Sequence, residues 1–243
     1  MKTARQRQLH MLPTMPKLPG YEFKSLYVPC ANVSGDFYDF IQVSDHEIGI
    51  AMGDVSGHGV EAGIIMGMAK KALQIYARGQ SSPKEALVLT NADLGRDLDG
   101  QTFVSAAYGI LDTQQHVFRF ARAGNSPPYL VNARRNPQLI EIKPNGMVIG
   151  VDKTGRAFGT VTKEESIQLC QGDLLFQYTD GLSEAPDRQK NEFGEERIKD
   201  LLQKNCSVSA AEIIDLMEEA VQSHIGALEQ EDDITMIAVR VTG

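Results

Sequence analysis

The heptapeptide Gly53-Asp54-Val55-Ser56-Gly57-His58-Gly59 decides how the chain around it folds. Residues 48–52 before it are apolar and predict a strand, and residues 60–77 after it carry apolar side chains at helical spacing. A glycine-rich turn between a strand and a helix lets the backbone approach an anion or a metal ion closely. Such a turn is more often structural than functional. A functional interpretation therefore depends on whether carboxylates occur in similar settings elsewhere in the sequence.

The composition of the chain is that of an ordinary globular protein: 42% of its 243 residues are hydrophobic and 23% are charged. A net charge of −8 argues against binding to nucleic acid or to an anionic membrane. Three scattered cysteines without CxxC spacing predict neither a disulfide framework nor a zinc site. With neither the apolar core of a signal peptide nor an apolar run long enough to span a membrane, we expect a cytoplasmic location.

Residues 1–20 differ from the rest, since a polar, helix-compatible piece is closed by Pro13, Pro16 and Pro19. They are typical of a linker from an upstream segment, of a short helix that docks on the domain, or of a frayed terminus. We expect the domain proper to cover residues 21–243.

Hydrophobic periodicity and turn residues predict the other elements of the domain. We expect strands at residues 21–28, 37–43, 48–52, 102–111, 115–123, 129–132, 139–142, 166–170, 174–178 and 234–241, helices at 60–77, 83–98, 195–204 and 210–228, and a loop over 146–159. Strands occur in runs with helices grouped between them, which favours an α+β fold of antiparallel sheet covered by helices.

Aspartates recur next to small residues at the ends of these elements, namely Asp36, Asp54, Asp180 and Asp232 or Asp233. If the strand ends converge, the carboxylates repel one another unless divalent cations bind between them. Oxygen ligands select Mg²⁺ or Mn²⁺, and two such ions about 4 Å apart suit the hydrolysis of a phosphate ester. The alternative is that each aspartate is only a turn or capping residue.

Other kinds of site lack support in the sequence. There is neither a phosphate-binding P-loop nor a G-x-S-x-G nucleophile motif, and no cysteine lies in an evident catalytic setting. His58, beside the central aspartate, is open to two interpretations: a proton relay or ligand-orienting group, or a capping or packing residue.

Several blocks in a fixed order resemble the metal-dependent Ser/Thr protein phosphatases of the PPM (protein phosphatase 2C-like) family, in the bacterial SpoIIE/RsbU branch. The blocks that carry this resemblance are residues 33–39 (VSGDFYD), 53–59 (GDVSGHG), 102–103 (TF), 123–128 (AGNSPP), 146–150 (GMVIG), 172–173 (GD), 178–185 (YTDGLSEA), 193–194 (FG) and 232–235 (DDIT). Each block is weak alone, but the ordered set is specific and covers roughly residues 18–242.

The resemblance implies a four-layer αββα sandwich, in which two antiparallel sheets are flanked by helices. It also implies that Asp36, Asp54 and the backbone carbonyl of Val55 hold two Mn²⁺ or Mg²⁺ ions, and that Asp180 and Asp232 complete the site. Hydrolysis would then use a water that bridges the ions. Supporting or substrate-binding roles are implied for Asp233, Gly181, Asn125 and His58, although Asn125 stands where this branch usually has histidine.

By the same resemblance, the expected activity is hydrolysis of phosphoserine or phosphothreonine, with a phosphorylated STAS-type anti-sigma-factor antagonist of a partner-switching pathway as substrate. The N-terminal piece resembles a linker to a sensor or receiver module, which would support regulation from upstream or pairing of two copies. Two alternatives stay open: a catalytically silent phosphoprotein-binding module of the same fold, and a hydrolase of small phosphate esters or cyclic nucleotides.

Overall fold

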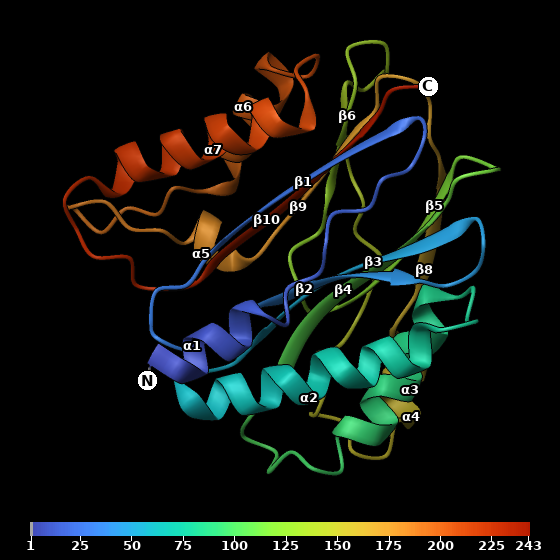
Figure 1. Ribbon diagram of the computed structural model, residues 1–243, viewed down its shortest axis with the longest axis vertical. Helices are drawn as coiled ribbons and strands as arrows, with labels where there is room; N and C mark the ends of the chain where they lie inside the picture. The colour runs from blue at the N-terminus through green and yellow to red at the C-terminus, as the bar shows by residue number, and fades with distance from the viewer. Residues whose placement is uncertain (1) are drawn as a thin grey trace. The chain divides into compact units, whose positions relative to one another are not determined.

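The computed structural model describes residues 2–243, which form two compact units, each with its own antiparallel sheet of five strands (Figure 1). The first unit contains residues 2–14, 31–125 and 143–169, and the second contains residues 15–30, 126–142 and 170–243. Both units are therefore assembled from segments that lie far apart in the sequence.

The sheet of the first unit has the strand order β2-β3-β4-β5-β8, with all neighbours antiparallel. Its strands are β2 (Phe37–Gln42), β3 (Glu47–Val55), β4 (Val104–Asp112), β5 (Val117–Ala123) and β8 (Glu164–Gln168). The β4–β5 hairpin turns where the side chain of Asp112 accepts hydrogen bonds from the backbone of Gln114 and Gln115. This arrangement is a side-chain-stabilised turn of the kind aspartate favours.

Helices α2 (Val60–Ala77) and α3 (Pro83–Leu94) pack against this sheet, and α4 (Arg156–Val161) packs against α3. Helix α2 buries Ala62, Met66, Ala69 and Leu73, whose spacing of three or four residues places them on one face. Helix α3 starts where the sequence predicts, because Ser82 caps it by accepting a hydrogen bond from the backbone of Glu85.

A short helix, α1 (Lys2–Leu9), belongs to the first unit. Its Gln8 side chain is buried and exchanges two hydrogen bonds, of 2.7 and 2.9 Å, with the backbone of Ser34. This contact is of the kind expected of a docked helix. The division of the chain into a linker at 1–20 and a domain at 21–243 stays a prediction.

The sheet of the second unit has the order β1-β10-β9-β6-β7. Its elements are β1 (Tyr21–Val28), β6 (Tyr129–Val131), β7 (Leu139–Glu141), β9 (Leu174–Tyr178), β10 (Ile234–Val241), α5 (Asp180–Ser183), α6 (Glu195–Lys204) and α7 (Ala210–Ile225). Helix α7 packs on β1 and β10 and buries Ile213, Ile214, Met217 and Val221 (Figure 1).

The predicted α+β fold class, with two antiparallel sheets and flanking helices, is confirmed. Four local predictions are wrong, among them the end of α7, which stops at Ile225 and not at residue 228. Helix α3 ends at Leu94, with Gly95 as its C-terminal capping residue, so it does not reach residue 98. The expected loop over 146–159 contains the start of α4, and the sequence pattern gives no sign of α5. None of the helices in residues 2–243 is long and apolar enough to cross a membrane.

Candidate metal and phosphate site

The first group of predicted residues lies where β2 begins and β3 ends. Phe37 pairs with Gly53 in the antiparallel register, so Asp36 and Asp54 are the next opposed positions along the two strands. Asp36 is 1% exposed, whereas Asp54 is partly exposed. The backbone N–H of Asp36 donates to Oγ of Ser34 at 3.0 Å, which fixes the start of the strand. Strand pairing therefore brings together two carboxylates that are 18 positions apart.

Gly35 explains how oxygen atoms approach closely at this strand end. A Cβ atom placed on Gly35 would lie 2.9 Å from the carbonyl oxygen of Val55 and 3.3 Å from Oδ1 of Asp54. Two oxygen donors, one from the backbone and one from a carboxylate, therefore face the same small space. The Asp54 carboxylate and the Val55 carbonyl therefore both lie beside Gly35, and their role as metal ligands stays a prediction.

The turn after Asp54 is fastened to the chain ahead of β4. Ser56 N–H donates to the carbonyl of Phe103, and Phe103 N–H donates back to Oγ of Ser56, both at 3.0 Å. His58 follows on the exposed part of the turn, where it lines a cavity of about 270 Å³ together with Glu61 and Asp99. His58 is therefore exposed, and its role stays a prediction.

Asn125 is linked to Asp54 indirectly, through Ser105. Its side-chain Nδ2 donates to Oγ of Ser105 at 3.0 Å, and Ser105 is the cross-strand partner of Asp54. Asn125 itself is buried, and its carbonyl accepts a hydrogen bond from Arg122. It therefore contacts the residue of β4 that pairs with Asp54, and its supporting role stays a prediction.

The second group lies in the second unit, where β9 ends and β10 begins. Thr179 and Thr235 close the pairing of these strands by exchanging two hydrogen bonds of 3.0 Å. Asp180 follows directly after Thr179, and Asp232 and Asp233 precede β10. A Cβ on Gly181 would lie 2.1 Å from the carbonyl oxygen of Asp233, so only glycine allows this approach.

Burial and nearby carboxylates together raise the pKa of Glu184, which lies beside this group. Burial raises the pKa of Glu184 above its ordinary value, and the carboxylates of Asp180, Glu192 and Asp232 raise it further. Nearby negative charges disfavour the charged form of the Glu184 carboxyl. This electrostatic setting suits the binding of a positive ion.

Sequence reasoning missed Cys30, which lies beside the second group. Its backbone N–H donates to Oδ1 of Asp233 at 2.8 Å, although the two residues are 203 positions apart. Burial, followed by the charges of Asp233 and Asp232, raises the pKa of the Cys30 thiol to about 12. The pairing of β1 with β10 creates this contact, and periodicity alone gives no signal for it.

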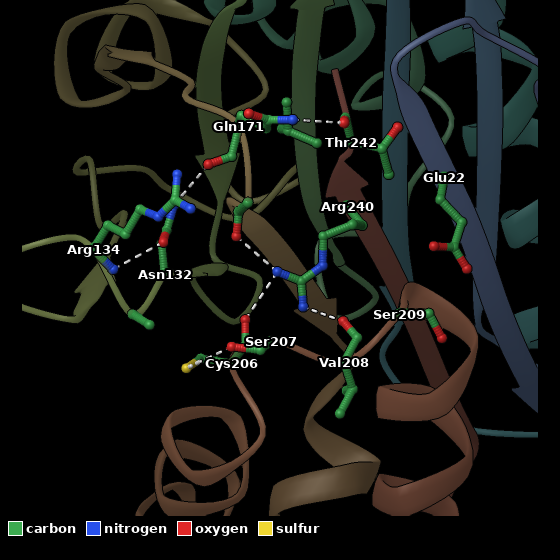
Figure 2. A pocket seen from close by; sticks show the side chains of 13 residues that line it. Glu22, Asn132, Arg134, Gln171, Cys206, Ser207, Val208, Ser209, Arg240 and Thr242 are labelled. Carbon is green, nitrogen blue, oxygen red and sulfur yellow. Dashed lines mark hydrogen bonds between the residues drawn. The ribbon is translucent and has the colours of Figure 1, made fainter.

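A separate cavity of about 510 Å³ lies toward the other end of β10 (Figure 2). Arg240, which is 6% exposed, donates from its guanidinium to the carbonyls of Gly172 (2.7 Å), Cys206 (2.9 Å) and Val208. These bonds tie the segment after α6 to the sheet. The arginine therefore has a structural role, and burial lowers its pKa.

Comparison with known proteins assigns the family. A family model described as stage II sporulation protein E (SpoIIE) matches residues 44–242. The chain belongs to the SpoIIE family. Two curated relatives are Protein IcfG from Synechocystis sp., 27% identical over 98% of this chain, and the phosphoserine phosphatase RsbU from Bacillus subtilis, 25% identical over 93%. The chain spans 41% of the length of IcfG and 65% of that of RsbU.

Solved structures show the same fold as this SpoIIE-family chain. The SiaA-PP2C domain of Pseudomonas aeruginosa superposes with a TM-score of 0.83 at 23% identity, over 98% of this chain and 94% of that one. The structure of the RsbU and RsbW domains of Rv1364c from Mycobacterium tuberculosis has a TM-score of 0.74 and 26% identity, over 94% of this chain and 62% of that one. The structure of RsbX in complex with magnesium has a TM-score of 0.69 and 16% identity, over 94% of this chain and 99% of that one. The resemblance to the PPM phosphatases is therefore confirmed for family and fold.

Proposed function

We propose that this chain is a metal-dependent protein phosphatase that hydrolyses phosphoserine and phosphothreonine. The observation that carries the proposal is the pair of strand-end carboxylate groups, Asp36 with Asp54 and Asp180 with Asp232, in a member of the SpoIIE family. Relatives named phosphoserine phosphatase support the substrate class.

The residues present fit hard divalent cations. The candidate donors are carboxylate oxygens and the Val55 carbonyl, and the glycine at position 35 leaves space beside two of them. Oxygen donors of this kind favour Mg²⁺ or Mn²⁺. We propose that Asp36, Asp54 and the Val55 carbonyl hold two such ions, with Asp180 and Asp232 completing the site. Bound ions of this type supply charge neutralisation and an activated water for attack on phosphorus.

The chain's own residues hold the donors in place. Ser34 fixes the backbone at Asp36, and Asn125 supports the strand of Asp54 through Ser105. Gly181 lets the Asp180 turn approach the Asp233 carbonyl. Positioning of this kind matters because a displacement of about 1 Å can cost a hundredfold in rate. We give Asp233, Asn125 and Gly181 supporting roles, and we give His58 a role toward the protein substrate, because it is exposed on the turn after Asp54.

We further propose a phosphorylated STAS-type protein as the substrate, in a partner-switching pathway. Support comes from RsbU among the relatives and from a solved neighbour that contains RsbU and RsbW domains. Because the matched relatives are longer than this chain, an upstream sensor or receiver module is part of the same proposal, and pairing of two copies through the N-terminal helix is a further one.

The test is hydrolysis of a phosphoserine-containing STAS protein and of p-nitrophenyl phosphate in Mn²⁺, with and without EDTA. We expect turnover that EDTA abolishes and that Asp54→Asn lowers by at least a hundredfold, with the phosphoprotein as the better substrate. Binding of the phosphoprotein without turnover would identify a silent binding module. Faster hydrolysis of the small ester would identify a small-ester hydrolase.

A further inference from the structure

Cys30, Asp232 and Asp233 form a mixed cluster of one thiol and two carboxylates within the second unit. We propose that this cluster is a binding site for a thiophilic divalent ion, Zn²⁺ or Cd²⁺, and that its occupation inhibits the phosphatase. The binding part stands on the second unit alone, whereas the inhibition rests on the proposed function, because Asp232 is also a proposed ligand of the catalytic ions.

The ligand atoms are close enough to share one ion. One sulfur and one oxygen from each carboxylate all lie within 4.8 Å of one another. Zinc binds sulfur at about 2.3 Å and carboxylate oxygen at about 2.1 Å, so a sulfur and an oxygen on one tetrahedral ion are about 3.6 Å apart. Side-chain rotations that bring the atoms closer by about 1 Å would therefore place all three around one cation.

The fold holds the two contributing segments together independently of any ion. Val28 at the end of β1 pairs with Ile234 at the start of β10, and Cys30 N–H donates to Asp233. The Gln230 side chain also connects the two segments, since its Nε2 donates hydrogen bonds to the carbonyls of Val28 at 2.8 Å and Asp232 at 2.6 Å. A preformed arrangement lowers the entropic cost of assembling the ligands.

The donor chemistry distinguishes this cluster from the oxygen-only sites. A thiolate favours Zn²⁺ and Cd²⁺, whereas Mg²⁺ and Mn²⁺ favour oxygen. Binding replaces the thiol proton by the metal, and the proton passes to solvent. Asp233 is buried, Cys30 is partly exposed and Asp232 is exposed, so the ion keeps access to water on one side. Three protein ligands with an open position are typical of an accessible zinc site.

Binding is tested on the full chain after EDTA treatment and dialysis, by titration with Cd²⁺ and detection of the ultraviolet charge-transfer band of a Cd²⁺–thiolate bond. We expect one tight site in the wild type, with the band lost and Zn²⁺ affinity weakened at least tenfold in Cys30→Ser. The matched control is Cys170→Ser, which removes an exposed thiol and should leave that tight site unchanged. A band lost with Cys170 and kept without Cys30 would overturn the proposal.

Asp233→Asn provides a second variant that keeps the acceptor for Cys30 N–H while it removes the charge. We expect its Cd²⁺ affinity to fall at least tenfold while its thermal unfolding remains cooperative. An unchanged affinity would refute the three-ligand site.

Inhibition is measured separately, as the Zn²⁺ concentration that halves the Mn²⁺-dependent rate of each variant relative to its own rate without Zn²⁺. Cys30→Ser should need at least tenfold more Zn²⁺. A tight Cd²⁺ site in a chain without phosphatase activity would contradict only the proposed function. Activity without the site would contradict only the present inference.

Discussion

Lys70 on α2 and Asp39 on β2 form an ion pair of 2.9 Å between two side chains that are 7% and 4% exposed. Lys70 also donates to the carbonyl of Tyr38 at 2.8 Å, and Gln74 donates to Asp39 at 2.7 Å. The pair therefore fastens α2, which follows the Asp54 turn, to the strand that begins after Asp36.

Replacing Lys70 by methionine leaves Asp39 buried without its cation. We expect the free energy of unfolding to fall by about 3–5 kcal/mol, because an uncompensated buried charge is costly. Urea denaturation measures this loss. The control is Lys71→Met on the exposed face, which should change stability by less than about 0.5 kcal/mol. Equal losses in the two variants would show that the ion pair contributes nothing specific.

The start of α7 gives a prediction about pH. Ser209 and Glu212 form a capping box, in which each side chain bonds the other's backbone N–H. Ser209→Ala should cost about 1 kcal/mol. The backbone hydrogen bond from Ser209 lowers the pKa of Glu212 below its ordinary value of 4.5. Its contribution is therefore present above that value and is lost as the pH falls through the lower, folded-state pKa.

The corresponding measurement compares wild type with Glu212→Gln by urea unfolding at neutral pH and in acid. Because glutamine does not titrate, the stability difference between the two proteins should shrink on acidification. A difference that stays constant with pH would contradict the capping contribution.

The close approach at Gly181 predicts a position-specific effect of a single methyl group. Gly181→Ala places a Cβ against the Asp233 carbonyl, so the turn that carries Asp180 has to move. We expect Mn²⁺ affinity, measured by calorimetry, to fall at least tenfold. The control is Gly159→Ala in α4, where the nearest atom to the added Cβ is 3.9 Å away on Val88. Similar affinities in the two variants would argue against the close approach.

The sequence predicts the elements best where a long apolar pattern has clear ends. Helix α2 begins and ends as predicted, because Gly59 and Gly79 flank a long run with apolar residues at helical spacing, and β10 follows from a mostly apolar run. Helix α4 was missed because it starts after Gly155 in a glycine-rich stretch with little periodicity, and α5 is only four residues long. Both helices depend on contacts with neighbouring elements, α3 for α4 and β10 for α5, more than on an apolar pattern in their own sequence.

In the candidate site, too, some features could be predicted from the sequence and others could not. The aspartates could be predicted because each lies at a strand end beside small residues, and the ordered motifs assign the family. Cys30 could not be predicted, because its contact with Asp233 depends on the β1–β10 pairing across 203 positions. The exposed position of His58 also depends on how its turn folds, so its role stays a prediction.

The most direct test of the proposed metal site is a crystal structure of the full chain grown with Mn²⁺, with diffraction data collected to locate manganese by its anomalous scattering. The account predicts anomalous peaks in contact with the carboxylates of Asp36, Asp54 and Asp180, and their loss in Asp54→Asn crystals. Peaks elsewhere, or bound manganese that does not contact Asp54 in the wild type, would contradict it.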